Sequence, residues 1–259
     1  DGLSLHYYTH PGGWEHKGPA TGFDDKVWYE SLKKTLKMEE LIDKHIEIMN
    51  KYDKEKRVGL IVDEWGGWYD VEPGTNPGFL YQQNTMRDAL IAGINLNVFN
   101  KHCDRVKMAN IAQMVNVLQA VILTEGDKMV LTPTYHVFNM YKNHQEATLV
   151  DSYIETETIG VDDSKVPNLH ESVSVDSEGK VNITINNLSI ADDYDVESVL
   201  VDKKINSVKA EILTGDMNAH NTFDDPEAVK PVEFTDYKIT DQGMNFKIPA
   251  CSVISFVLE

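Results

Sequence analysis

Two adjacent carboxylates, Asp63 and Glu64, are the side chains of this chain whose types and placement best suit chemistry. They follow a largely apolar run, 58–62, and come just before Trp65 and Trp68. Such a run is typical of a strand buried on both faces in a parallel sheet, and barrel enzymes keep their catalytic groups at the carboxyl ends of such strands. Flat indole rings suit a sugar ring, so we expect Glu64 to be the nucleophile of a retaining glycosidase. The alternative interpretation is a strand end whose acid simply meets solvent.

The segments around these carboxylates alternate between strand-like and helix-like patterns. Strand-like runs occupy 3–8, 58–64 and 106–115. Apolar residues recur at helical spacing over 25–51, which Asp24 or Asp25 would cap, and over 81–100, with a shorter helix expected at 133–145. This rhythm predicts βαβ units and a parallel sheet over residues 1–145.

The period of the pattern changes near residue 146. Val181, Ile183 and Ile185 alternate with polar neighbours, and turn signals separate several short runs of this kind. Alternation with frequent turns is typical of an antiparallel sandwich, which we expect over residues 146–259. The polar segment 216–230 is expected to be a loop between two of its strands.

Composition excludes several classes of partner. The net charge is −18, which argues against a nucleic-acid backbone or an anionic membrane surface. No apolar run reaches the ~20 residues that span a bilayer. The two cysteines, Cys103 and Cys251, have no metal-ligand spacing, so no metal site is expected. The compartment stays open between bacterial cytoplasm, periplasm and secretion. The chain opens on Asp1 within what reads as mid-domain sequence, and we expect a natural N-terminal portion to precede it.

Four motifs carry a resemblance to a known family. They are Leu-His-Tyr-Tyr at 5–8, Val-Asp-Glu-Trp at 62–65, Asn-Ile-Ala-Gln-Met-Val-Asn-Val-Leu at 110–118 and Thr-Pro-Thr-Tyr-His-Val-Phe at 132–138. In this order they resemble the C-terminal part of an α-L-arabinofuranosidase of glycoside hydrolase family 51. The resemblance implies the last three βα units, strands 6–8, of a (β/α)8 TIM barrel, followed by a jelly-roll-like antiparallel β-sandwich.

The resemblance also implies roles for single residues. Glu64, after strand 7, would be the nucleophile, and Tyr8, at the end of strand 6, would hydrogen-bond its carboxylate. Gln113, at the end of strand 8, would contact sugar hydroxyls, and Trp68 would form an apolar wall near the leaving group. His6 and Trp65 are carried over as supporting residues of the substrate site.

The residues by themselves leave structural alternatives open for these positions. Tyr8 could be a core tyrosine with a satisfied hydroxyl, and Gln113 could bond the backbone where its strand ends. Trp68 could belong to the core, and His6 could be a structural histidine on an apolar strand.

The second carboxyl group of a retaining glycosidase is absent from these residues. The family carries its acid/base glutamate behind an asparagine, and no Asn-Glu pair occurs in this sequence. A complete barrel takes about 250 residues, whereas about 145 precede the expected sandwich. We therefore expect a fragment that is inactive alone and whose partners are the N-terminal portion of the same protein and an arabinose-containing glycan. The implied activity is exo-hydrolysis of terminal arabinofuranosyl groups of arabinan or arabinoxylan, without a cofactor, and a homo-oligomer is compatible with it.

Two other functions stay open. One is a different retaining hydrolase of the same barrel clan, such as an endo-glucanase. The other is a non-catalytic carbohydrate-binding fragment, against which stands the absence of tryptophan from residues 146–259.

Overall fold

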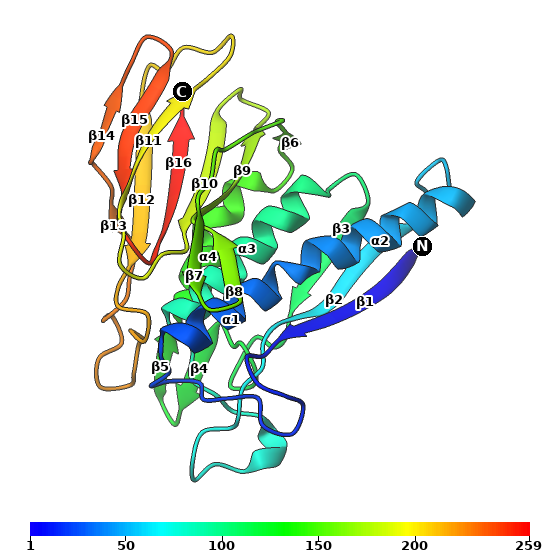
Figure 1. The fold of residues 1–259 in the computed structure, drawn as a ribbon, viewed down its shortest axis with the longest axis vertical. Helices are drawn as coiled ribbons and strands as arrows, with labels where there is room; N and C mark the ends of the chain where they lie inside the picture. Colours follow the sequence, from blue (N-terminus) through cyan, green and yellow to red (C-terminus); the bar gives the residue numbers. More distant parts are fainter.

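The computed structural model describes all residues from Asp1 to Glu259. Three parallel strands, β1 (Gly2–Thr9), β2 (Gly59–Gly67) and β3 (Val106–Ile111), form a sheet in that order. Helices α1 (Asp25–Thr35), α2 (Lys37–Tyr52), α3 (Met86–Lys101) and α4 (Pro133–Tyr141) pack on one side of it, between this sheet and a second, all-β part (Figure 1). The strand and helix alternation predicted for the first half of the chain is confirmed, and the parallel sheet with it.

The helix expected over 25–51 is two helices, so its single span is wrong. Asp24 caps α1 as predicted, because its carboxylate accepts a hydrogen bond from the amide of Val27. The break falls after Thr35, whose hydroxyl bonds back to the carbonyl of Ser31. Hydroxyls that bond back to the preceding turn compete with the helical backbone and often bend a helix.

Helix α3 begins at Met86, five residues later than the sequence pattern indicates. A capping box fixes this start, since Thr85 accepts from the amide of Arg87 and the carboxylate of Asp88 accepts from the amide of Thr85. Residues 81–85 are not helical, and the side chain of Gln82 instead bonds the backbone of Gly67 and Tyr69 at the end of β2.

The third strand and the last helix are also shorter than expected. Strand β3 ends at Ile111, after which the chain folds into an unpredicted hairpin of β4 (Ile122–Glu125) and β5 (Lys128–Leu131). Helix α4 ends at Tyr141 and continues as a 3-10 turn, η2 (Lys142–His144). Another 3-10 turn, η1 (Pro77–Phe79), lies in the loop after β2.

The remainder of the chain is mostly antiparallel sheet. A six-stranded sheet has the order β13-β12-β16-β10-β9-β6, and a three-stranded sheet has the order β11-β15-β14. The bounds are β6 (Thr148–Leu149), β9 (Leu169–Val175), β10 (Val181–Asn187), β11 (Tyr194–Val199), β12 (Val208–Thr214), β13 (Val232–Glu233), β14 (Tyr237–Ile239), β15 (Gly243–Ile248) and β16 (Ser252–Leu258). Phe246 and Phe256 from the two sheets meet in a shared core, with ring centroids 4.9 Å apart. The expected antiparallel sandwich is confirmed. Residues 216–230 form the loop between β12 and β13, as expected.

A small hairpin, β7 (Thr158–Val161) and β8 (Ser164–Pro167), packs against α1 rather than on the sandwich. The division of the chain at residues 145 and 146 therefore stays a prediction.

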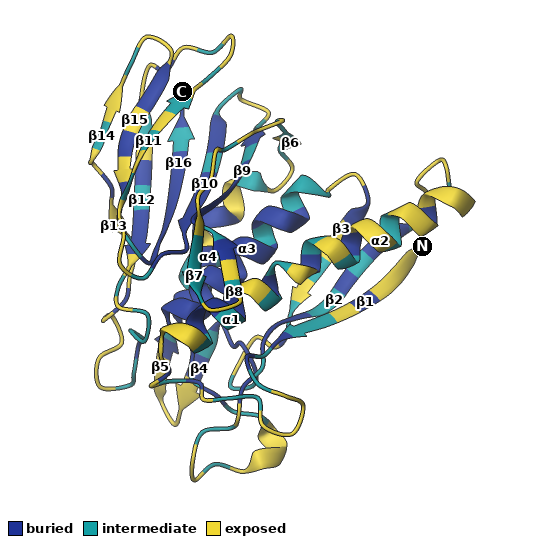
Figure 2. Ribbon diagram, viewed as in Figure 1, coloured by how far each residue is buried: buried dark blue, intermediate teal, exposed yellow.

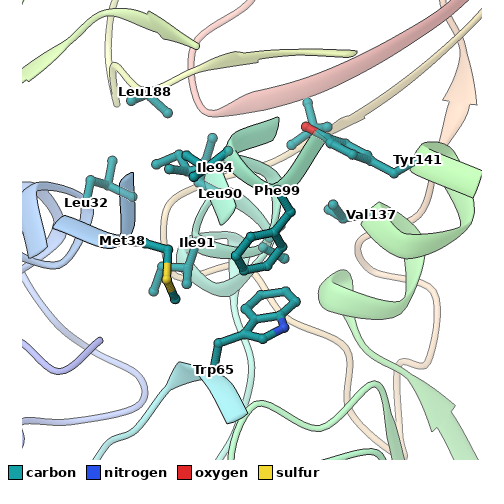
Figure 3. Close-up of a cluster of buried hydrophobic side chains, with 14 of the residues drawn as sticks. Leu32, Met38, Trp65, Leu90, Ile91, Ile94, Phe99, Val137, Tyr141 and Leu188 are labelled. Carbon is teal, nitrogen blue, oxygen red and sulfur yellow. The ribbon is translucent and has the colours of Figure 1, made fainter. Parts of the chain in front are cut away.

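Helix α3 occupies the centre of the molecule. It contacts β2 on one side and strands β9, β10 and β16 on the other, and it is buried on nearly all sides (Figure 2). Figure 3 shows Trp65 of β2 pointing toward Phe99 of α3 within the largest apolar cluster, which also holds Leu188 of the sandwich part. Because α3 lies between the parallel sheet and the six-stranded sheet, the two halves share the largest apolar cluster, while the sandwich has a second cluster of its own. No helix of the structure has the length and apolar character needed to cross a membrane.

Candidate active site

An irregularity in the pairing of β2 aims both carboxylates at the same face of the sheet. Leu5 of β1 pairs with Val62, but the next residue, His6, pairs with Glu64, so Asp63 is an extra residue. The pairing of β2 with β3 is irregular over the same stretch, between Val62 and Trp65. Successive side chains of a regular strand alternate between faces, and one extra residue moves every later side chain to the opposite face.

The bulge changes which side chains reach the core. Val62 and Trp65 are both fully buried in the apolar cluster, whereas Asp63 and Glu64 are partly exposed. Without the bulge, Glu64 would share the core face with Val62. The two carboxylates therefore stand together on the face that the helices leave uncovered.

Alternate residues of β1 meet these carboxylates. The hydroxyl of Ser4 donates to Oδ1 of Asp63 at 2.8 Å. The ring of His6 bridges both acids, with Nε2 2.9 Å from Oδ1 of Asp63 and Nδ1 3.6 Å from Oε2 of Glu64. The hydroxyl of Tyr8 donates to Oε2 of Glu64 at 2.7 Å. Three side chains spaced by two residues thus fix the orientation of two carboxylates.

The intervening residues of β1 face the helices. Leu5 and Thr9 are buried, and the hydroxyl oxygen of Thr9 lies 3.1 Å from that of Thr35 on α1. The hydroxyl of Tyr7 donates to the carbonyl of Lys34 at 2.6 Å. The two adjacent tyrosines of this strand therefore serve opposite faces, and only Tyr8 serves the carboxylates.

The surroundings shift the ionisation of two of these groups. The hydrogen bond from Ser4 holds the pKa of Asp63 below its usual range, against a smaller opposing effect of burial and with support from His6. Burial raises the pKa of Tyr8 far above its usual range, and the hydrogen bond to Glu64 and the charge of that carboxylate raise it further. Tyr8 therefore remains a protonated donor throughout the pH range in which proteins are studied, so its hydrogen bond to the carboxylate persists.

An aromatic wall stands beside the carboxylate. The half-buried ring of Trp68 meets Tyr8 edge to face, with ring centroids 5.1 Å apart. Trp68 follows the end of β2, where its amide donates to the carbonyl of Thr9 at 2.8 Å. The structure thus brings together four of the six expected site residues, namely Glu64, Tyr8, His6 and Trp68.

The other two expected residues lie elsewhere. Gln113 is exposed just beyond the carboxyl end of β3. Trp65 is fully buried, with its ring stacked on Phe138 and edge to face with Phe99. A direct contact between Trp65 and a sugar does not agree with this position, because the bulge has turned the indole into the core.

Some residues that shape this region were not predicted. Besides Ser4, the fully buried Gln119 was not expected: it holds the end of β2, where its Oε1 accepts from the amide of Gly67 at 2.5 Å. Its Nε2 donates to the carbonyl of Asp88 at 2.8 Å. Gly66 makes room for it, since a Cβ at Gly66 would lie 3.0 Å from that Oε1 and the residue has a φ of +133°. No spacing in the sequence indicates Gln119, because its partners come from distant segments.

No three histidine, cysteine, aspartate or glutamate side chains converge in a way that could hold a metal ion. The chemistry that this arrangement offers is that of an oriented carboxylate beside an aromatic wall. Such a group can act as a nucleophile or as a base.

Comparison with known proteins places this arrangement in a family. The family model described as alpha-L-arabinofuranosidase C-terminal domain matches residues 63–252. An intracellular exo-alpha-L-arabinofuranosidase from Bacteroides ovatus is 45% identical over all of this chain, which covers 51% of that relative. An intracellular exo-alpha-(1->5)-L-arabinofuranosidase from Streptomyces lividans is 24% identical over 89% of this chain and 36% of its own length.

Solved structures agree. The GH51 arabinofuranosidase from Xanthomonas axonopodis pv. citri superimposes with a TM-score of 0.98 and 47% identity, over 100% of this chain and 53% of that one. The α-L-arabinofuranosidase from Thermotoga maritima gives a TM-score of 0.79 at 25% identity, over 99% and 52%. The chain spans about half the length of the Bacteroides, Xanthomonas and Thermotoga arabinofuranosidases. The chain therefore belongs to the α-L-arabinofuranosidases of glycoside hydrolase family 51 and corresponds to their C-terminal portion.

Proposed function

We propose that residues 1–259 form the nucleophile-bearing half of a retaining exo-α-L-arabinofuranosidase that removes terminal arabinofuranosyl groups from arabinan- or arabinoxylan-type glycans. The observation that carries the proposal is the carboxylate of Glu64, which stands at the carboxyl end of a parallel strand with a tyrosine hydroxyl 2.7 Å away. The names of the relatives support the substrate class.

The reaction follows from the requirements of retention. An oxygen of Glu64 attacks the anomeric carbon while the bond from that carbon to the leaving oxygen breaks, and a protonated carboxyl group gives its proton to the leaving oxygen. The product is a covalent arabinosyl ester of Glu64. Water, deprotonated by the same second carboxyl group, then releases arabinose and restores the carboxylate. Tyr8 holds the attacking oxygen in place, and His6 and Gln113 are proposed to contact the sugar, with Trp68 as its apolar wall.

The second carboxyl group is proposed to come from a portion of the polypeptide that is not among these residues. Asp63 does not suit this part, because it is ionised and already bonded to Ser4 and His6. No Asn-Glu pair occurs in the sequence, and the relatives are about twice as long. A site completed by an N-terminal portion accounts for both observations.

We further propose that β1, β2 and β3 are strands 6–8 of a (β/α)8 barrel, within a unit of residues 1–145, and that 146–259 form the sandwich unit. The parallel order supports this, as does the position of all helices on one face. The outer edges of β1 and β3 are unpaired, and Met108 is 54% exposed on β3. Five further strands would pair these edges and cover this face. A homo-oligomer stays a prediction.

The proposal can be tested with a two-part enzyme. In it, the part of the Bacteroides ovatus relative that precedes the matched segment is joined to Asp1 of this chain. We expect the two-part enzyme to hydrolyse 4-nitrophenyl α-L-arabinofuranoside and the chain alone to show no turnover. The Glu64→Gln variant should lose activity, whereas Glu197→Gln on the exposed face of β11 should not.

Covalent labelling then locates the nucleophile. A mechanism-based arabinofuranosyl inactivator should add one sugar to the peptide that contains Glu64, as shown by mass spectrometry. Label on any other residue, or full activity of Glu64→Gln, would refute the proposed role. Activity on aryl glucosides in place of arabinofuranosides would instead favour the endo-glucanase-like alternative.

A further inference from the structure

The segment between β1 and α1 is a long loop, 10–24, that is fastened on both sides of Trp14. Four side chains from four different parts of the chain bind its backbone. The ammonium of Lys34 donates to the carbonyls of residues 10–12, and the carboxylate of Asp70 accepts from the amides of residues 17 and 18. The guanidinium of Arg87 donates to the carbonyls of residues 19 and 20. The side-chain amide of Asn218 bonds the backbone of residues 22 and 23. A loop held in this way is ordered before any ligand arrives, so binding to it has a low entropic cost.

What the loop presents is an exposed indole. Trp14 is 68% exposed, although it is among the largest apolar side chains of the protein. Its ring meets Trp68 edge to face, with centroids 5.3 Å apart. Trp68 in turn contacts Tyr8, which holds Glu64. The contacts thus form a row that leads from the carboxylate outward to solvent.

A cation completes the surface. The ammonium of Lys17 lies 4.6 Å from the ring centre of Trp14 and 4.7 Å from that of Trp68. It donates to the carbonyl of Trp14 at 2.6 Å, which uses one of its three hydrogens. The other two can serve hydroxyl groups of a ligand that lies against the indoles.

We propose that Trp14 and Lys17, together with Trp68, form a binding site for the glycan on the leaving-group side of the scissile bond. The inference rests on the proposed function, because it takes the reacting sugar to lie at Glu64. The reacting sugar of an exo-enzyme needs an enclosed position, whereas the rest of the glycan extends into solvent. An exposed indole with a fixed ammonium donor matches this outer part, since it offers a flat apolar surface and a hydrogen-bond donor to a neutral sugar.

The test compares two substrates in the two-part enzyme. With α-1,5-linked arabinotriose, the leaving group is an oligosaccharide that can reach Trp14; with 4-nitrophenyl α-L-arabinofuranoside, it is a single small ring. We expect Trp14→Ala to lower kcat/KM about tenfold for the triose and less than about twofold for the aryl substrate, as loss of one stacking contact implies. Lys17→Met should lower kcat/KM about threefold for the triose only. Trp14→Phe, which keeps an aromatic ring, should retain most of the kcat/KM that Trp14→Ala loses.

Tyr153→Ala, which removes an aromatic ring that is 86% exposed at another place, is the matched control and should change neither value. Equal losses on both substrates would overturn the inference, because Trp14 would then support the loop or the reacting sugar. Unchanged hydrolysis of the triose would also overturn it. If the unmodified two-part enzyme hydrolyses neither substrate and Glu64 takes no label, the proposed function itself fails and this inference falls with it.

Discussion

The hydrogen bond between Tyr8 and Glu64 yields the sharpest prediction about catalysis. Tyr8→Phe removes the hydroxyl that donates to Oε2 of Glu64 at 2.7 Å and keeps the ring that packs on Trp68. The next donor, Nδ1 of His6, is 3.6 Å from the same oxygen, beyond the range of a good hydrogen bond. The carboxylate would therefore lose its only close fixed donor and could rotate away from the line of attack.

The size of the effect follows from the kind of bond and its exposure. A hydrogen bond to a charged group contributes about 1.5–3 kcal/mol. The side chain of Glu64 is 46% exposed, so water can replace part of the interaction and the lower end of that range applies. About 1.5 kcal/mol corresponds to roughly a tenfold lower rate of formation of the arabinosyl-enzyme.

The assay is the second-order rate of inactivation of the two-part enzyme by the arabinofuranosyl inactivator, because this rate reports the attack of Glu64 and not the release of arabinose. Tyr7→Phe is the matched control. It removes an equally short hydrogen bond from the next residue of the same strand, but on the face that packs on α1. We expect Tyr7→Phe to change the inactivation rate by less than about twofold and to lower the free energy of unfolding by about 1 kcal/mol.

Two results would contradict this reasoning. The first is an inactivation rate for Tyr8→Phe that equals or exceeds that of the unmodified enzyme, which would mean that the hydroxyl does not position the nucleophile. The second is an equal loss in Tyr7→Phe, which would mean that the strand as a whole, and not the hydroxyl of Tyr8, determines the rate.

Two further predictions concern the shared core and can be measured by urea unfolding of the 259-residue chain. Trp28→Phe removes the hydrogen bond from Nε1 of Trp28 to the carbonyl of Leu188, both fully buried, and should lower the free energy of unfolding by about 2–4 kcal/mol; a value below about 0.5 kcal/mol would show that this contact does not join the two halves. Burial lowers the pKa of His144 and of His170 to about 4, with Lys101 adding to the effect at His170. The unfolded chain then binds more protons than the native one between about pH 6.5 and 4, so stability should fall on acidification by up to about 1.4 kcal/mol per pH unit for each histidine. Replacing both histidines by glutamine should flatten this dependence relative to the unmodified chain, and an unchanged slope would assign it to other groups.

Local features of this fold could be predicted from the sequence. Asp24 caps α1 through an atom three residues away, and the alternation at Val181, Ile183 and Ile185 indicates the strand β10, although the polar residues between them are buried as well. These signals depend on neighbours along the chain. The position of Glu64 after a buried parallel strand was also predicted from the residues, whereas its hydrogen bond with Tyr8 was predicted from the resemblance to the family.

The direction of the side chains after Val62 could not be predicted. Strict alternation places Asp63 and Trp65 on the site face and Glu64 in the core. The extra residue in β2 reverses this order beyond Asp63, and it depends on how β1 and β3 pair with β2, which no local pattern encodes. For this reason the ring of Trp65 lies in the core and not on the site face. The contact of Asp63 with Ser4 was not predicted because it joins residues 59 positions apart in the sequence.

The contact of Asn218 with Gly22 and Phe23 has a consequence for how such proteins can be recombined. Asn218 belongs to the sandwich part, between β12 and β13, yet it ties down the loop that carries Trp14. A foreign sandwich grafted onto the first half of the chain would have to fill the space around α3, and it would release the loop at Gly22 and Phe23 unless it brought an equivalent amide. Exchange of modules between homologues is thus constrained by this side chain as well as by the apolar cluster that both halves share.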